Sequence, residues 1–240
     1  MKGEDRITPS RENCVYTSCY CEENVWKLCE FVRLEKTAPL EELFVVFISN
    51  ENRMVPLWKQ KSGRGDQPVI WVCDIPARLT ILMSQTVLNN HHDVIMRSCV
   101  FQDYHVVLLQ VGLQSDTLLY DLDSELSFPC SLKLYANQAL RSDHHINPTY
   151  HRKLRVVPAD SFLLNFASDR SHMRNSDGSW RMPPPPYPPI QTTETQMNLD
   201  DFISMNPAVG WGAVLSLDHF LQRFMAGSSS SSTSSTAASS

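Results

Sequence analysis

The sequence predicts a single domain in which helices and strands are mixed. Three observations support this: an amphipathic helical stretch near the N-terminus, several apolar runs of strand length after it, and a short glycine-containing connection between two of these runs. The chain has 240 residues, of which 42% are apolar, and this is enough to bury a real core. We expect the domain to span residues 13–226, with a flexible segment at 1–12 and a disordered serine-rich tail at 227–240.

Charge and hydropathy argue against two kinds of partner. The formal net charge is −5, from 21 basic and 26 acidic residues, and no basic stripe is visible, so we expect no nucleic-acid binding. No apolar run approaches the ~20 residues of a membrane span, and the polar N-terminus lacks the apolar centre of a secretory signal. We therefore expect a soluble intracellular protein that does not bind membranes.

The predicted elements follow one another from Glu22 onward. A helix begins there, because Val25, Leu28, Cys29 and Val32 fall at i, i+3, i+4 and i+7. Runs of strand length then cover residues 44–49, 54–58, 69–71, 105–111, 117–121 and 152–157. Helical or amphipathic segments are expected at residues 131–141, 160–167 and 218–224. The proline-rich residues 183–189 should run extended over the surface, as a stiff connector or as a ligand for a proline-reading module.

Cys21 lies immediately before the predicted helix. A thiol there feels the positive end of the peptide dipoles, which favours the thiolate, and the free backbone N–H groups can hold an oxyanion. The seven cysteines are an odd number, scattered along a chain without an export signal, so we expect reduced thiols. Two other interpretations of Cys21 stay open: a packed structural cysteine, or a zinc ligand together with Cys19, whose spacing is tighter than usual zinc motifs.

Residues 105–111 and 117–121 flank a short connection containing Gly112, which predicts an antiparallel hairpin. If the connection is centred on Leu113, His105 lies opposite Asp121 on the same face, with Cβ atoms ~4.5–5.5 Å apart. The carboxylate would then bond one imidazole nitrogen, fix the tautomer and support the imidazolium. A slip of one residue would turn one side chain to the other face, so this prediction depends on the register.

Long strings of residues around these positions resemble one known family. They are SCYCEEN at 18–24, WKLC at 26–29, FISNE at 47–51, DYHVVLL at 103–109, YDLD at 120–123, NFASDRSHM at 165–173, PPPPYP at 183–188, NLDDFISM at 198–205 and GWGAV at 210–214. These strings closely resemble the eukaryotic protein N-terminal glutamine amidohydrolases. The resemblance covers most of residues 13–224, apart from one block.

The resemblance implies an α+β fold with an antiparallel sheet and packed helices, similar to papain-like and transglutaminase-like cysteine hydrolases. It implies conversion of N-terminal Gln to Glu in proteins or peptides, with ammonia release, in the arginine branch of the N-degron pathway. The resemblance also implies a catalytic triad. The second cysteine of CYC, Cys21, would be the nucleophile, and the histidine of DYH, His105, would be the general base. The first aspartate of YDLD, Asp121, would be the third member of the triad. No metal or cofactor is needed, and a monomer in cytosol and nucleus is expected.

Recognition of a chain terminus requires a partner for the α-ammonium group. Glu22 and Glu23 are the candidates, since carboxylates are natural partners of an ammonium. The alternative is that both glutamates simply favour the helix N-terminus electrostatically.

One block departs from the family. The family motif runs Trp-Asp-Tyr-His without interruption, whereas residues 72–102 here separate Trp71 from Asp103. The block is an unusual splice product, a gene-model error or a tolerated loop, which we expect to loop out; its sequence at 91–93, His-His-Asp, raises a metal site as an alternative. An inactive or binding-only protein, or a protease- or transglutaminase-like enzyme, are therefore the rival functions.

Overall fold

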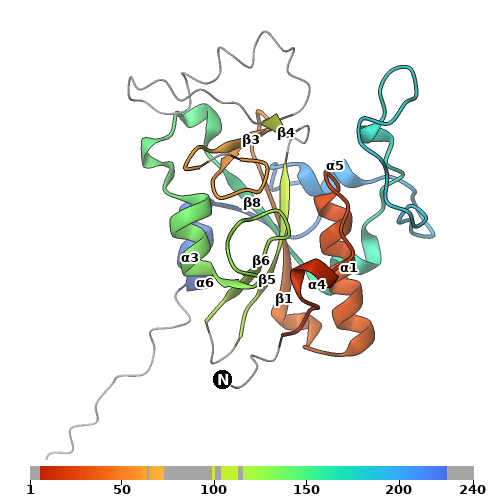
Figure 1. The fold of residues 1–240 in the computed structure, drawn as a ribbon, viewed down its shortest axis with the longest axis horizontal. Coiled ribbons are helices and arrows are strands. Elements are labelled where there is room, and N and C mark those ends of the chain that lie inside the picture. Colours follow the sequence, from red (N-terminus) through yellow and green to blue (C-terminus); the bar gives the residue numbers. More distant parts are fainter. Residues whose placement is uncertain (1–5, 64, 73–98, 101–103, 113–115, 226–240) are drawn as a thin grey trace, which may run out of the picture.

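Six antiparallel strands form the central sheet, in the spatial order β7-β6-β5-β1-β8-β9 (Figure 1). Their bounds are β1 Leu43–Ser49, β5 His105–Gln110, β6 Leu118–Tyr120, β7 Cys130–Ser131, β8 Lys153–Pro158 and β9 Ala213–Ser216. The structure is a computed structural model that describes residues 6–63, 65–72, 99–100, 104–112 and 116–225. Residues 1–5 of the predicted flexible segment and the predicted disordered tail at 227–240 lie outside the described residues.

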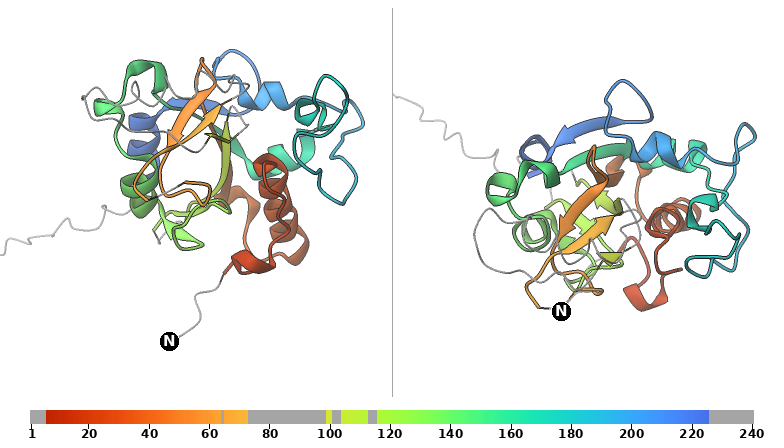
Figure 2. Two further views of the ribbon diagram at one scale, coloured as in Figure 1. Left: turned by 45° about the horizontal axis from the view of Figure 1, so that its top comes forward. Right: turned by 90° about the horizontal axis from the view of Figure 1, so that it is seen from above.

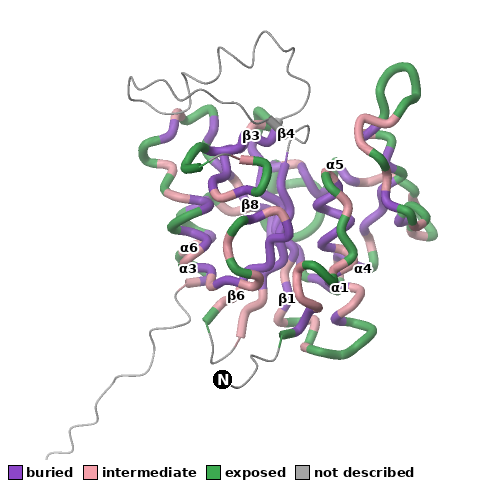
Figure 3. The backbone as a smooth tube through the Cα atoms, in the orientation of Figure 1, coloured by how far each residue is buried: buried purple, intermediate pink, exposed green. Residues whose placement is uncertain are grey.

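Both faces of the central strands are buried (Figure 3). Along β1, the side chains of Leu43, Val45 and Phe47 enter one apolar cluster, and those of Val46 and Ile48 enter another. This alternation follows from the two-residue period of a strand. Because an apolar cluster covers each face of the sheet, the sequence of β1 is a nearly continuous apolar run rather than an alternating one.

Helices cover the two faces of the sheet (Figures 1 and 2). On one side lie α1 Cys21–Glu35, α4 Ala159–Asn165 and α5 Leu199–Ile203. On the other side lie α3 Leu132–Tyr135, which continues as a π-helix over Ala136–Leu140, and α6 Leu217–Met225. Short 3₁₀ turns occupy Arg11–Asn13, Leu40–Glu42, Asp143–His145, Pro148–Tyr150 and Ser171–Met173.

A second, three-stranded sheet has the order β2-β3-β4, with bounds β2 Met54–Leu57, β3 Val69–Val72 and β4 Cys99–Val100. β3 runs antiparallel to β2 and parallel to β4, where Ile70 pairs with Cys99 and Trp71 with Val100. The two ends of the inserted block therefore lie side by side. Residues 73–98 and 101–103 lie outside the described residues, and with them most of the loop predicted at 72–102 and the metal alternative at 91–93. Val72, Cys99 and Val100 differ from that prediction, because they belong to β3 and β4.

The α+β class and the antiparallel sheet with packed helices are confirmed. The helix from Glu22 and the strand-length runs appear as expected, whereas α5 and the strands β4, β7 and β9 were not predicted. Residues 6–12 also differ from the flexible segment predicted there: Ile7 is only 4% exposed, and the Arg11 guanidinium donates to the carbonyl oxygens of Asp121 and Leu126. Among the described residues, no helix combines the length and apolar character needed to cross a membrane.

Candidate active site

Cys21 is the first residue of α1 and is 3% exposed. A tight turn delivers the chain to this point, with Cys19 in the left-handed region at φ 66°. Asn24, in the first turn of α1, holds the turn: its side-chain oxygen accepts from the Thr17 amide, and its amide donates to the Thr17 carbonyl, both at 2.8 Å. The backbone N–H groups at this helix start lack intrahelical partners, as at any helix N-terminus.

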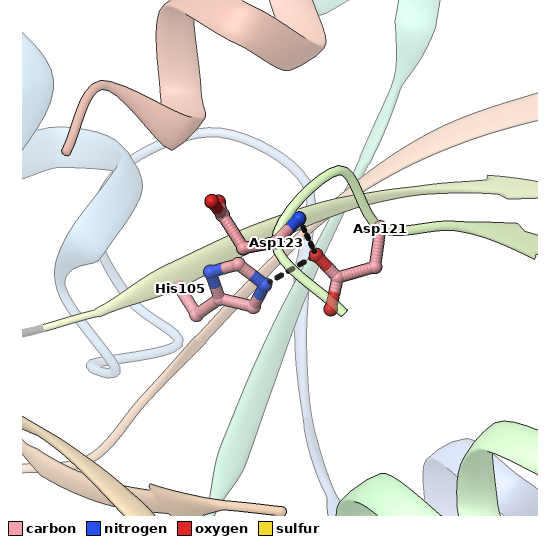
Figure 4. Close-up of side chains that lie close together, drawn as sticks. All are labelled: His105, Asp121 and Asp123. Atoms are coloured by element: carbon pink, nitrogen blue, oxygen red, sulfur yellow. Dashed lines mark hydrogen bonds and ion pairs between the residues drawn. The ribbon is translucent and has the colours of Figure 1, made fainter. Parts of the chain in front are cut away.

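His105 and Asp121 meet as the sequence predicts, but not by the predicted register. Tyr120 pairs with Leu108, two residues further along β5 than expected, and Asp121 follows the end of β6. A shift of two residues keeps side chains on the same face, which preserves the encounter. His105 Nε2 lies 3.0 Å from Asp121 Oδ1, and both side chains are buried (Figure 4).

Asp121 accepts hydrogen bonds on both carboxylate oxygens. Oδ1 also accepts from the Asp123 amide at 2.9 Å, while Oδ2 accepts from the Tyr135 hydroxyl at 2.7 Å and from Gln60 Nε2 at 3.3 Å. Burial alone would raise the pKa of Asp121, but the His105 charge and these donors lower it to about 2. Asp121 is therefore an anion at neutral pH.

The His105 ring has one bonded and one free nitrogen. Burial lowers its pKa, but the charge and hydrogen bond of Asp121, with a smaller contribution from Asp123, outweigh burial and raise it. The Nδ1 atom is buried and has no hydrogen-bond partner among the described residues. Because Asp121 accepts at Nε2, the neutral ring carries its proton there and presents Nδ1 as an acceptor.

Cys21 is not hydrogen-bonded to His105. Its thiol donates instead to Glu22 Oε2 at 3.8 Å, while the backbone amide of Val106, next to His105 in the chain, interacts with the sulfur. Burial, followed by the charges of Glu22 and Asp123, raises the pKa of the Cys21 thiol well above its usual value. Burial and these charges therefore act against the thiolate, which the start of a helix favours.

The two candidate glutamates have different surroundings. Glu23 is fully buried and forms a bidentate ion pair with Arg170. The Arg170 Nε atom donates to Glu23 Oε1 and the Nη2 atom to Oε2, each at 2.8 Å. Glu22 is also fully buried, and its Oε1 lies 3.6 Å from His172 Nε2 without a hydrogen bond. Burial and then the Glu23 charge raise the pKa of Glu22 to about 8. Glu22, rather than Glu23, has capacity left for a cationic ligand.

The proline-rich segment lies against this ion pair. Besides Glu23, the Arg170 guanidinium donates to the carbonyl oxygens of Pro185, Tyr187 and Pro188. It also lies 5.1 Å from the centre of the Tyr187 ring. Residues 183–189 are thus fastened to the first turn of α1, which agrees with a connector role.

Sequence reasoning missed several neighbours of the site. The indole ring of Trp71 stacks on His105, with centroids 4.3 Å apart and planes at 29°. Tyr135 and Gln60, which bind Asp121, and Arg170, which binds Glu23, were not predicted either. Two of them carried a signal: the family motif places Trp71 three residues before the histidine, and Arg170 lies in the family-like string at 165–173.

One group of three metal-ligand side chains lies in the part of the chain that the structure describes: His105, Asp121 and Asp123, whose ligand atoms lie within 4.8 Å of one another (Figure 4). Two of these side chains already bond each other, and the Asp123 carboxylate accepts from the Tyr16 hydroxyl. This arrangement suits an acid–base pair with a neighbouring carboxylate. That no metal is required stays a prediction.

A thiol at a helix start, a histidine with a free nitrogen and a buried carboxylate behind it are the groups that thiol-dependent hydrolases use. Comparison with known proteins narrows this class. A sequence model of the family described as N-terminal glutamine amidase matches residues 16–76 and 75–224, which is most of the chain. The chain belongs to this family, and the break between the matched segments falls inside the block at 72–102.

Curated relatives named protein N-terminal glutamine amidohydrolase are similar over almost the whole chain. The Danio rerio protein is 52% identical over 218 residues, 91% of this chain and 93% of the relative. The Homo sapiens protein is 50% identical over 217 residues, 90% of this chain and 91% of the relative. The Drosophila mojavensis protein is 44% identical over 221 residues, 92% of this chain and 93% of the relative.

Proposed function

We propose that this chain hydrolyses the side-chain amide of an N-terminal glutamine to glutamate, with release of ammonia. Cys21, His105 and Asp121 would carry the reaction. The observation that carries the proposal is the buried bond between His105 and Asp121 beside the start of α1, in a member of a family whose relatives bear this activity in their names.

The first half of the reaction forms a thioester. His105 Nδ1 takes the proton of the Cys21 thiol while the sulfur attacks the side-chain carbonyl carbon of the glutamine. Backbone N–H groups at the start of α1 hold the oxyanion of the tetrahedral intermediate. The imidazolium then gives its proton to the leaving nitrogen, the C–N bond breaks, and ammonia departs.

The second half releases glutamate. His105 takes a proton from water as the water oxygen attacks the thioester carbon, and collapse of the intermediate breaks the C–S bond. The imidazolium returns its proton to the Cys21 sulfur, and Asp121 stabilises the imidazolium in both halves. The reaction requires the Cys21 sulfur to approach Nδ1, and such contacts often tighten only when the substrate is bound.

Restriction to a chain terminus would come from Glu22. Its carboxyl contacts the Cys21 thiol and keeps one oxygen without a hydrogen bond. The α-ammonium of the substrate would pair with this carboxylate and drive its ionisation, because a nearby positive charge lowers a carboxyl pKa. Glu23 would keep its structural role with Arg170.

Matched peptides test the proposal. The full chain is incubated with three peptides: one with a free N-terminal Gln, one with the same Gln acetylated, and one with Gln at the second position. We expect ammonia release and conversion to Glu with the first peptide only. Equal release from the acetylated peptide would overturn terminal specificity, backbone cleavage would indicate a protease, and incorporation of an added amine would indicate a transglutaminase.

A second candidate function is binding of the N-terminal Gln without turnover. The missing hydrogen bond between Cys21 and His105 favours it, as does the block that interrupts the motif before His105. Alkylation with iodoacetamide separates the two: in the enzyme, His105 accepts the thiol proton, so Cys21 reacts faster than an ordinary thiol near neutral pH. A slow reaction, together with peptide binding and no ammonia, would support the binding protein.

The sequence resemblance supports three further proposals. The fold would be related to those of papain-like and transglutaminase-like cysteine hydrolases. The product would enter the arginine branch of the N-degron pathway. The chain would act as a monomer in the cytosol and nucleus.

A further inference from the structure

Trp71 contacts His105 in a way that the proposed chemistry does not use. The two ring centroids are 4.3 Å apart and the planes are inclined by 29°, so the indole lies over the imidazole face. Both residues are buried, Trp71 at 3% and His105 at 0% exposure. Stacking at this distance brings the two rings into direct contact.

The backbone fixes both rings independently. Trp71 is paired with Val55 of β2 on one side and with Val100 of β4 on the other. His105 is the first residue of β5, where it pairs with Ile48 of β1. The stack therefore joins the small sheet to the central sheet at the imidazole.

The charged and titratable groups around His105 come from two other elements. Asp121 and Asp123 follow β6, and Asp121 is bonded to the ring. Cys21 and Glu22 open α1, and the Cys21 sulfur interacts with the amide of Val106. From β3 the ring meets the face of an indole, which is electron-rich and attracts a cation more than a neutral ring.

We propose that Trp71 is a positioning residue for the reaction, which stabilises the imidazolium form of His105 through the face of its indole ring. This inference rests on the proposed function, because the imidazolium carries the proton from Cys21 to the departing nitrogen. Asp121 supports the same form from the ring edge and Trp71 from the ring face. The two contributions are therefore separable by substitution.

Fluorescence measures this contact without turnover. Protonated imidazole quenches an adjacent indole, so the difference between the emission of the wild type and of Trp71→Phe should titrate with the protonation of His105. In the Asp121→Asn background, where the imidazolium loses its anion, we expect the midpoint of this titration to move to lower pH. Trp211→Phe is the matched control, because Trp211 is 38% exposed and packs on Phe202 instead; its difference emission should show no midpoint that responds to Asp121→Asn.

Kinetics measure the consequence. Trp71→Leu removes the aromatic face, and we expect kcat to fall about tenfold with KM within about twofold of the wild type. Trp71→Phe keeps a weaker aromatic face and should lose no more than about threefold. Alkylation of Cys21 by iodoacetamide near neutral pH should become slower in Trp71→Leu, because the imidazolium that forms when His105 accepts the thiol proton is less stable.

Two results would overturn the inference: a Trp71 emission that does not respond to Asp121→Asn, or a folded Trp71→Leu variant with the wild-type kcat and alkylation profile. Should Trp71→Leu fail to fold, the wild-type and Trp71→Phe titrations decide alone. Absence of ammonia release from the wild type would refute the proposed function. It would leave the fluorescence result unaffected, so the two failures are distinguishable.

Discussion

Two buried carboxyl groups face the candidate site from different elements, and their surroundings leave one of them ionised and the other neutral. Asp121, after β6, is 3% exposed, and Glu22, in the first turn of α1, is 0% exposed. Asp121 accepts four hydrogen bonds and has a pKa of about 2. Glu22 has an oxygen without a hydrogen bond and a pKa of about 8.

The difference shows that burial alone does not determine the charge of a carboxyl group. Donors and a positive charge aimed at a carboxylate replace the water it loses, as at Asp121. At Glu22 the donors are outweighed by burial and by the charge of Glu23, so this carboxyl group keeps its proton. The Asp121 carboxylate, after β6, is thus a permanent anion that supports the imidazolium form of His105. The start of α1 instead holds a neutral acid, which becomes an anion when a cation is bound.

The largest expected effect is at the sulfur itself. Cys21→Ala should abolish turnover, because no other group in the site can form the thioester. Ammonia release from the free N-terminal Gln peptide measures it. Cys19→Ala is the matched control, two residues earlier in the same turn, and should keep most of the activity. The reverse result would show that the nucleophile within the CYC motif has been misassigned.

The second largest effect is expected at Asp121, the permanent anion. Asp121→Asn should lower kcat by about 10³-fold or more, because the imidazolium loses its counter-charge and the ring can adopt the wrong tautomer. Asp123→Asn removes a neighbouring carboxylate that is not bonded to the ring, and we expect a loss of less than about tenfold. Equal losses in both variants would mean that net charge matters rather than the bond between His105 and Asp121.

The third largest effect is expected at Glu22, the neutral acid. Glu22→Gln should raise KM for the free N-terminal Gln peptide by about tenfold or more, with a smaller change in kcat, because the α-ammonium loses its partner. In the wild type, KM should fall as pH rises from 6 toward 8, since Glu22 ionises more readily. The variant should lose this dependence. Glu30→Gln, on the same helix, is the control and should leave KM unchanged.

Thermal unfolding gives the same test without substrate. Burial raises the pKa of Glu22 from the usual 4.5 to about 8, so the folded protein holds a proton that the unfolded chain releases between these values. Wild-type stability should therefore fall across this pH range. The Tm of Glu22→Gln relative to the wild type should increase with pH over the same range, and a constant difference would contradict a buried, protonated Glu22.

The smallest effect concerns the block that interrupts the motif. Removing residues 72–102 rejoins Trp71 to Asp103, and we expect activity to be preserved or raised by no more than a few fold. The hydrogen bond between His105 and Asp121 is present with the block in place, which is why a large gain is not expected. A soluble, folded deletion variant that is less active than the full chain would show that the block contributes to the site.

Much of the fold was predictable because its central elements have strong periodicity. The stripe from Val25 to Val32 marks α1, and the apolar runs mark β1 and β5. β9 was missed because it is a short, partly exposed edge strand without an alternating pattern. Gly212, beside it, has φ 73°, and a Cβ there would approach the Val156 carbonyl oxygen to 2.1 Å, a close backbone contact that only the folded structure reveals.

The pairing of His105 with Asp121 was predictable, but its register was not. The register depends on the turn geometry between β5 and β6, and the apolar pattern constrains only which face each residue occupies. The partners that determine charge, such as Arg170 for Glu23 and Tyr135 for Asp121, come from distant segments of the chain. No local sequence pattern encodes such contacts, so neither the pKa of Glu22 nor the neutralisation of Glu23 could be foreseen.

The parallel pairing of β3 with β4 also has a practical consequence for protein engineering. Since Ile70 pairs with Cys99 and Trp71 with Val100, residues 99–100 lie directly beside β3. The separation of the two ends is then set by the ladder, and the entropic cost of the intervening chain grows only slowly with its length. This position is a natural graft point, where an affinity peptide or a fluorescent reporter domain could be exchanged for residues 73–98.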